Sequence, residues 1–155
     1  MSGVPTPWKG YDDIVVGASI TGHGRTITEA DVLMYTALTT GFHQPIHTDL
    51  EYVRTRTGFA ERLLPGPAII SYSIGLLGGT LVYRDITVAF AGLDNVRAKT
   101  PVFAGDTITP VATVASKRLT SNPERGLVTL SIEVKKATGE TAMTYEYMLM
   151  VTVLS

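Results

Sequence analysis

The stretch LPGPAIISYSIGLLGGTLVY, residues 64–83, decides the fold that this sequence predicts. Gly66 and Pro67 are typical of a helix start, because proline loses no hydrogen bond at the first helical position. No charged residue occurs from Ala68 to Leu81, and a helix that is apolar on every face is buried on most sides. Small residues keep this helix narrow, so we expect a sheet to approach it closely: Ser71, Gly75, Gly78 and Gly79.

After this helix the apolar residues begin to alternate with polar ones, the period of strands that are buried on one face. Residues 128–135 show the pattern clearly, with Val128, Leu130, Ile132 and Val134 on one face. The same reasoning predicts further strands at 86–94, 108–117 and 145–153. The expected fold is therefore of the α+β class, a curved antiparallel sheet wrapped around one buried helix.

The residues before this helix predict two shorter helices and a strand. Residues 14–27 predict the strand, and a capping box of Thr28 and Asp31 predicts the first helix, which Gly41 ends. A second capping box, Thr48 with Glu51, predicts a short helix to about Thr57. Apolar residues repeat at helical intervals on one face of the first helix: Ala30, Leu33, Met34, Ala37 and Leu38. We predict a single domain over residues 14–155, preceded by a loosely held arm, residues 1–13.

Composition excludes several classes of function. The 155 residues are 45% hydrophobic and 17% charged with a formal net charge of −1, which argues against disorder and against a nucleic-acid partner. Cysteine is absent, so disulfides, thiolate nucleophiles and cysteine-bound metals are excluded. No signal peptide or uninterrupted membrane span is predicted. We expect a soluble cytoplasmic protein with no membrane partner.

Reactive side chains gather in one loop, GFHQPIHTD, residues 41–49. It holds His43 and His47, whereas His23 is interpreted as a structural or solvated residue. His43 and His47 are four residues apart, but Pro45 prevents the continuous helix that would align them on a metal ion. No metal site is therefore predicted.

The order of these motifs resembles the MaoC-like dehydratases, which include the (R)-specific enoyl-CoA hydratases. The resemblance rests on a Gly-x-x-x-Pro-Ile-His-x-Asp loop, a Pro-Gly pair before the buried helix, and Pro101-Val102-x-x-Gly105-Asp106-Thr107. It covers residues 17–152 and implies a hotdog fold that acts on an acyl thioester. In that family an Asp and a His hold the water that adds to C3, and a glycine N–H polarises the thioester carbonyl.

Carried over to this sequence, the resemblance makes His47 the base and Gly66 the carbonyl-polarising residue. The family's Asp position is occupied by Phe42, which can neither orient water nor exchange a proton. Auxiliary candidates that lie nearby in the sequence are His43, Asp49 and Ser71. The expected activity is reversible hydration of a trans-2-enoyl thioester.

The resemblance also implies a homodimer or a larger oligomer, a coenzyme A or acyl-carrier thioester as substrate, and no separate cofactor. Several cations are candidates to meet the carrier's phosphates: Arg54, Arg56, Arg62, Arg97, Lys99, Lys117 and Arg118. Two alternatives stay open. Phe42 favours a non-catalytic protein that only binds acyl thioesters, and a thioesterase would need a carboxylate such as Glu61 or Asp85.

Overall fold

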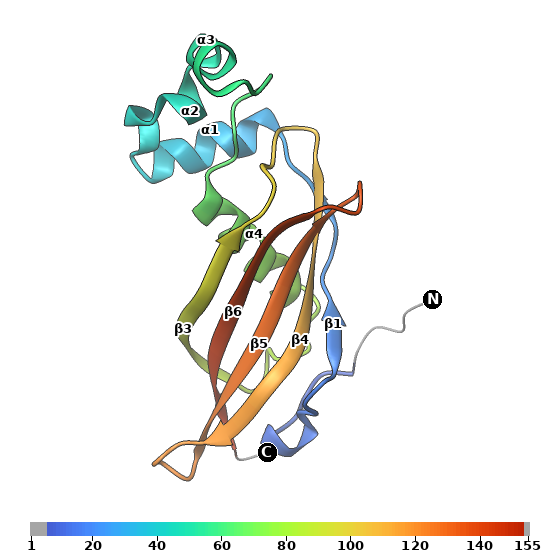
Figure 1. Cartoon of the computed structure of the whole chain (residues 1–155). Coiled ribbons are helices and arrows are strands. Elements are labelled where there is room, and N and C mark those ends of the chain that lie inside the picture. The colour runs from blue at the N-terminus through green and yellow to red at the C-terminus, as the bar shows by residue number, and fades with distance from the viewer. Residues whose placement is uncertain (1–5, 154–155) are drawn as a thin grey trace.

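A computed structural model describes residues 6–153 and contains one curved antiparallel sheet (Figure 1). Its strands pair in the order β1-β4-β5-β6-β3, and β2 pairs with β4 beside β1. The strands of this sheet are β1 (Ser19–Thr21), β2 (Arg25–Thr26), β3 (Thr87–Ala98), β4 (Thr107–Leu119), β5 (Arg125–Lys136) and β6 (Thr141–Thr152). The predicted strands after residue 85 are therefore confirmed, each at slightly wider bounds.

The helices lie before the long strands in the chain, and the longest of them lies against the sheet (Figure 1). They are α1 (Glu29–Leu38), α2 (Pro45–Thr48), α3 (Leu50–Tyr52) and α4 (Gly66–Gly78), with 3-10 turns at Tyr11–Asp13 and Gly41–His43 and a π turn at Val53–Thr57. The sheet curves around α4, so the predicted α+β hotdog fold is confirmed. No helix within residues 6–153 is long and apolar enough to cross a membrane.

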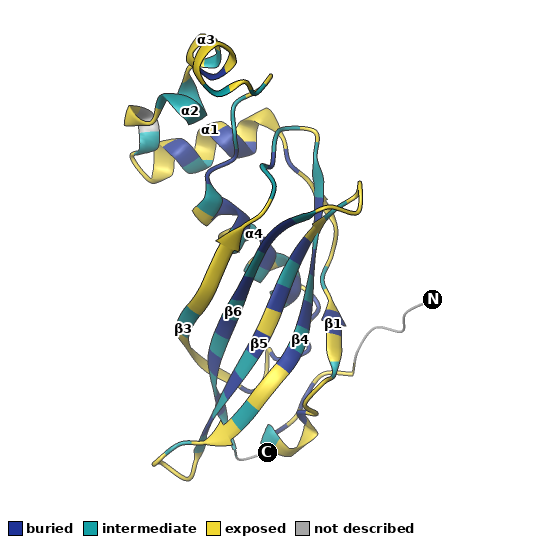
Figure 2. Cartoon of the chain, viewed as in Figure 1, coloured by how far each residue is buried: buried dark blue, intermediate teal, exposed yellow. Residues whose placement is uncertain are grey.

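The core lies between α4 and the concave face of the sheet. Val128, Leu130, Ile132 and Val134 are all buried, as their alternation predicts (Figure 2). One buried polar contact fixes the helix to the sheet: a 2.7 Å hydrogen bond joins the Ser73 and Tyr145 hydroxyls. Burial raises the pKa of Tyr145 to about 12, so this hydroxyl stays protonated throughout the neutral range.

The small residues of α4 do not all face the sheet, which corrects the expectation of a close approach there. Ser71 and Gly75 are exposed, whereas Ala68, Ile69, Ser73 and Leu77 are buried. The sheet therefore packs on the larger apolar side chains, and the narrow side of the helix faces outward.

The predicted strand over residues 14–27 is wrong as one continuous element. Gly17 has φ +89°, a conformation that breaks an extended chain, and Val15 and Val16 are exposed. Only β1 and β2 are strands, separated by residues 22–24. Position 22, between these strands, requires glycine because a Cβ there would lie 2.7 Å from the Pro110 ring.

The first predicted helix is confirmed, but its apolar face does not pack inward. Thr28 and Asp31 form the capping box of α1. The side that packs inward carries Asp31, Val32 and Thr36. The predicted apolar stripe is exposed instead, including Leu33, Met34 and Leu38 at 42%, 70% and 82% exposure.

The second capping box is also wrong, by one residue. Thr48 is the last residue of α2, and its hydroxyl donates to the Gln44 carbonyl. The cap of α3 is Asp49, whose carboxylate accepts a hydrogen bond from the Tyr52 N–H. The helical turns continue to Thr57, as predicted, and end at Gly58 with φ +76°.

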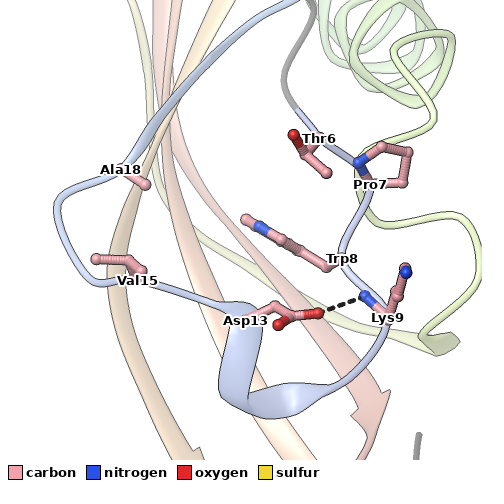
Figure 3. A pocket seen from close by; sticks show the side chains of 7 residues that line it. All are labelled: Thr6, Pro7, Trp8, Lys9, Asp13, Val15 and Ala18. Atoms are coloured by element: carbon pink, nitrogen blue, oxygen red, sulfur yellow. Dashed lines mark hydrogen bonds between the residues drawn. The ribbon is translucent and has the colours of Figure 1, made fainter.

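Part of the predicted N-terminal arm packs on the domain, while residues 1–5 lie outside the described chain. Trp8 is 8% exposed, and its main-chain N–H donates to the Val82 carbonyl at 2.7 Å. Figure 3 shows the Trp8 ring pointing into a pocket of about 480 Å³ that Val15 and Ala18 also line. A hydrogen bond from the Lys9 N–H to Asp13 closes one side of this pocket.

Candidate functional site

The His47 ring is oriented by a main-chain carbonyl. His47 lies on α2, is half-buried, and its Nδ1 lies 2.8 Å from the Leu63 oxygen. A carbonyl only accepts hydrogen bonds, so Nδ1 carries the proton and donates it. In the neutral ring this leaves the Nε2 lone pair free to accept a proton from another molecule.

Residues 63 and 64 connect the loop that holds His47 to a distant part of the chain. The Leu63 N–H donates to the Ile46 carbonyl at 3.3 Å, and the Leu64 N–H donates to the Val102 carbonyl at 2.8 Å. Leu63 also forms an isolated β-bridge with Phe103. The histidine loop, residues 63–64 and residues 102–103 are therefore joined by main-chain hydrogen bonds.

Gly66 begins α4, directly after Pro65, which is the N-cap. Its N–H belongs to the first turn, where helical N–H groups have no partner within the helix. Among residues 6–153 no hydrogen bond is recorded for it. A Cβ at this position would contact only Met143 among the described residues, at 3.8 Å, so the space on the side-chain side of this glycine is open.

His47 and Gly66 line the same pocket, which has a volume of about 300 Å³. Most of the remaining wall is apolar, and Phe59 packs edge-on against Phe103 beside it. The other described lining residues are Phe59, Leu63, Leu64, Ile69, Ala98, Lys99, Thr100, Pro101 and Val102. A free imidazole nitrogen and a free main-chain N–H thus share one mainly apolar pocket.

One wall of this pocket, the segment of residues 100–106, is fixed by Lys136. The Lys136 ammonium lies 2.9 Å from the Asp106 carboxylate and 3.2 Å from the Pro101 oxygen, which accepts a hydrogen bond from it. It also lies 5.9 Å from the centre of the Phe103 ring. The Asp106 carboxylate accepts the Phe103 N–H at 2.9 Å, so the whole segment is anchored from β5.

The auxiliary candidates lie elsewhere. His43 is exposed, Asp49 caps α3, and neither lines the pocket among the residues described. The Phe42 side chain lies outside the described part of the chain. Ser71 donates to the Pro67 carbonyl and lies 3.4 Å from the Tyr35 hydroxyl, in a separate groove between α1 and α4 of about 850 Å³.

The carboxylates that a thioesterase would need also lie away from the pocket. Glu61 pairs with Arg54, and Asp85 pairs with Arg84, all on the surface. The described lining of the pocket includes no Asp or Glu. Within residues 6–153, no group of three or more side chains of the metal-binding types could hold a metal ion.

Sequence reasoning identified His47 and Gly66 but missed most of the pocket around them. Lys99 was one of several cations, with nothing to single it out. Pro101 and Val102 belonged to a motif whose contact with the histidine loop is visible only in three dimensions. Phe59 carried no signal in the sequence at all.

This chain is similar in sequence to a known family of domains. The family model described as "MaoC like domain" matches residues 15–136. Protein MaoC of Klebsiella aerogenes is 35% identical over 100 residues, which are 64% of this chain and only 29% of that protein. The chain thus spans less than a third of the length of this curated relative.

Solved structures match over nearly the whole chain. A protein described as a monoamine oxidase regulatory protein from Archaeoglobus fulgidus superimposes with a TM-score of 0.88 and 30% identity, covering 98% of this chain and 99% of that one. The (R)-hydratase from A. caviae, described as involved in PHA biosynthesis, has a TM-score of 0.69 and 26% identity. That match covers 88% of this chain and 96% of the hydratase.

Proposed function

This chain belongs to the MaoC-like domain family, and on that premise we propose that it adds water reversibly to a trans-2-enoyl thioester, giving the 3-hydroxyacyl thioester. The observation that supports the proposal is that His47 and Gly66 line the same pocket. The likeness to an (R)-hydratase at 26% identity points to the same reaction.

In the proposed reaction, His47 Nε2 takes a proton from water while the water oxygen bonds to C3. The electrons of the C2–C3 double bond move toward the thioester carbonyl, whose oxygen becomes negative. The Gly66 N–H, at the positive end of α4, stabilises that oxygen. The imidazolium then returns its proton to C2, so one water is added and nothing else is consumed. We therefore propose that no separate cofactor takes part.

The Leu63 carbonyl has a defined part in this scheme. Its hydrogen bond keeps the proton on Nδ1 and holds the ring in one orientation, with Nε2 left as the acceptor. This orienting role belongs to a carboxylate in many histidine sites, and here the main chain provides it.

The test is hydration of crotonyl-CoA by the purified full-length chain, followed by the loss of ultraviolet absorbance of the conjugated thioester. We expect His47→Gln to lower kcat by about a hundredfold, because a positioned general base contributes roughly 10²–10⁴ in rate. His23→Gln is the matched control. His23 contacts the Gly79 carbonyl outside the pocket, so this variant should retain activity.

A second candidate function is binding of acyl thioesters without turnover, favoured by Phe42 at the family's Asp position. Calorimetry separates the two functions. Binding of crotonyl-CoA with no hydration in wild type would replace the proposed reaction with this one. Release of free thiol from acyl-CoA would instead indicate a thioesterase.

We also propose that the chain forms a homodimer through the free edge of β3. This strand ends the sheet, and its residues are exposed or half-buried along the whole length (Figure 2). Val88, Phe90 and Val96 expose apolar side chains there. An exposed apolar edge of this length readily pairs with another strand, and two copies of one edge match under a two-fold axis.

A further inference from the structure

We propose that Lys99 binds a phosphate of the thioester's carrier at the mouth of the His47 pocket. This inference rests on the proposed function and specifies which part of the substrate meets which end of the pocket. Lys99 directly follows β3 and lines the pocket together with His47 and Gly66. It is the only described lining residue that carries a full positive charge.

The ammonium of Lys99 has no counter-ion in the described structure. No hydrogen bond or ion pair of its side chain is recorded within residues 6–153, although its main-chain N–H donates to the Ala142 carbonyl at 2.9 Å. The main chain is therefore fixed while the charged end stays exposed and free to meet an anion.

The other cations suggested by the sequence lie outside this pocket, and most have partners of their own. Arg54 pairs with Glu61, and Arg62 pairs with Glu29. Lys117 donates to the Tyr11 carbonyl and lies 4.6 Å from the centre of its ring. Among these cations, only Lys99 both lacks a counter-ion in the described chain and lines the pocket that holds His47 and Gly66.

The chemistry of the lining gives the direction in which the substrate lies. An acyl chain is apolar, and it can pack on the apolar lining residues Phe59, Leu64 and Ile69. The hydrocarbon part of an acyl group offers an ammonium no hydrogen-bond acceptor. Coenzyme A and a carrier-protein arm both join the thioester to phosphate through pantetheine, so an anion necessarily follows the reacting carbonyl out of the pocket. A lysine meets such a phosphate as a compact, mobile charge.

The experiment compares crotonyl thioesters of coenzyme A, of 4′-phosphopantetheine and of phosphate-free pantetheine. We expect Lys99→Gln to raise KM for crotonyl-CoA by about tenfold or more, as expected for the loss of one charge-assisted hydrogen bond, and to leave kcat within about twofold. The pantetheine thioester should be unaffected, and Lys99→Arg should restore most of the affinity. Arg84→Gln, which removes an exposed charge outside the pocket, is the control and should change KM by less than about twofold.

The three thioesters also identify the phosphate. An equal effect on the coenzyme A and 4′-phosphopantetheine thioesters assigns the contact to the phosphate that both carriers share. An effect on coenzyme A alone assigns it to the nucleotide part. An equal loss with pantetheine, or a fall in kcat, would overturn the proposal and place Lys99 at the reacting carbonyl.

Calorimetry with coenzyme A separates failure of this inference from failure of the proposed function. If wild type hydrates nothing but binds coenzyme A, and Lys99→Gln loses that binding, the anion site stands and the hydratase proposal fails. If wild type is active and Lys99→Gln matches it with coenzyme A, the hydratase proposal stands and the anion site fails. Absence of both activity and coenzyme A binding in wild type would overturn both.

Discussion

At Gly66, the free N–H and the missing side chain make separate contributions. The N–H supplies a donor for a developing negative charge, and the missing Cβ allows the thioester to reach that donor. Inside the protein the space is open, since a Cβ would touch only the end of Met143 at 3.8 Å. The position therefore separates an effect on activity from an effect on folding.

We predict that Gly66→Ala lowers kcat/KM for crotonyl-CoA by about tenfold or more, because the added Cβ keeps the thioester oxygen away from the N–H, and such a donor typically contributes 10²–10³ in rate. The free energy of unfolding should change by less than about 1 kcal/mol, since alanine fits the space and suits a helix. Steady-state kinetics and urea denaturation measure the two effects. Gly78→Ala is the control: its Cβ would lie 3.9 Å from the Tyr83 hydroxyl, outside the pocket, and activity should persist. A Gly66→Ala variant with full activity would show that the thioester does not need the open space beside this N–H.

His47 and Gly66 could be proposed from the sequence because each lies in a short motif that resembles the MaoC-like family. His47 follows a proline loop and Gly66 starts a helix, and both features are readable from neighbouring residues. Lys99 and Phe59 could not be predicted, because their places depend on contacts with chain segments far away in the sequence. The Leu64 N–H bond to the Val102 carbonyl is one contact that brings such segments together.

Among the elements, α1 is joined to both β2 and α4 by the carboxylate of Asp31. Asp31 lies 2.5 Å from the Arg25 guanidinium on β2 and accepts both the N–H and the hydroxyl of Thr28 at 2.8 Å. The Tyr72 hydroxyl of α4 also donates to it, at 3.3 Å. Burial by itself raises the pKa of Asp31, but the hydrogen bonds from Thr28 and Arg25 outweigh it and lower the pKa below 3.8.

This lowered pKa gives the sign of a pH dependence. Stabilisation by Asp31 is fully present above the unfolded-state pKa of 3.8 and is lost as the pH falls through the lower folded-state pKa. We predict that Asp31→Asn reduces the free energy of unfolding by about 2 kcal/mol at pH 7, as expected for charged hydrogen bonds. The difference from wild type should shrink as the pH falls below that window, as measured by urea denaturation at each pH.

Asp85→Asn is the control for this prediction, since its exposed partner Arg84 lies on the same surface loop and the pair should not contribute measurably to stability. A penalty for Asp31→Asn that stayed constant down to pH 2.5 would show that the loss reflects shape and hydrogen bonding but not charge.

The same helix shows where periodicity fails as a guide. Its capping box could be predicted, because capping depends on residues three positions apart. Its inward face could not, because the apolar stripe of Leu33, Met34 and Leu38 is exposed and the inward face carries the bonded Asp31 and Thr36. An apolar stripe therefore does not by itself specify which face of a helix packs against its own chain.

For the whole molecule, most of the exposed large apolar side chains lie on α1 and β3, and others lie at Val15, Val16, Leu81 and Leu119. Figure 1 shows β3 at the edge of the sheet, with α1 beyond the end at which the strand finishes. The long strands β4, β5 and β6 could be predicted individually, but the order that leaves β3 at an edge could not, because alternation does not specify neighbours. That order determines which surface a second copy can cover.

We predict that wild type sediments as a dimer at micromolar concentration and that Phe90→Lys sediments as a monomer. A lysine on the edge strand would bring two charges together across the two-fold axis, and edge lysines oppose strand pairing. Because Phe90 also stacks on Tyr147 at 5.8 Å, Val88→Lys is the second variant, with no such ring contact within the protomer. Leu119→Lys, on β4 and 52% exposed, is the control and should remain dimeric. Analytical ultracentrifugation with circular dichroism decides the outcome: a monomeric wild type, or folded edge variants that stay dimeric, would place the contact elsewhere.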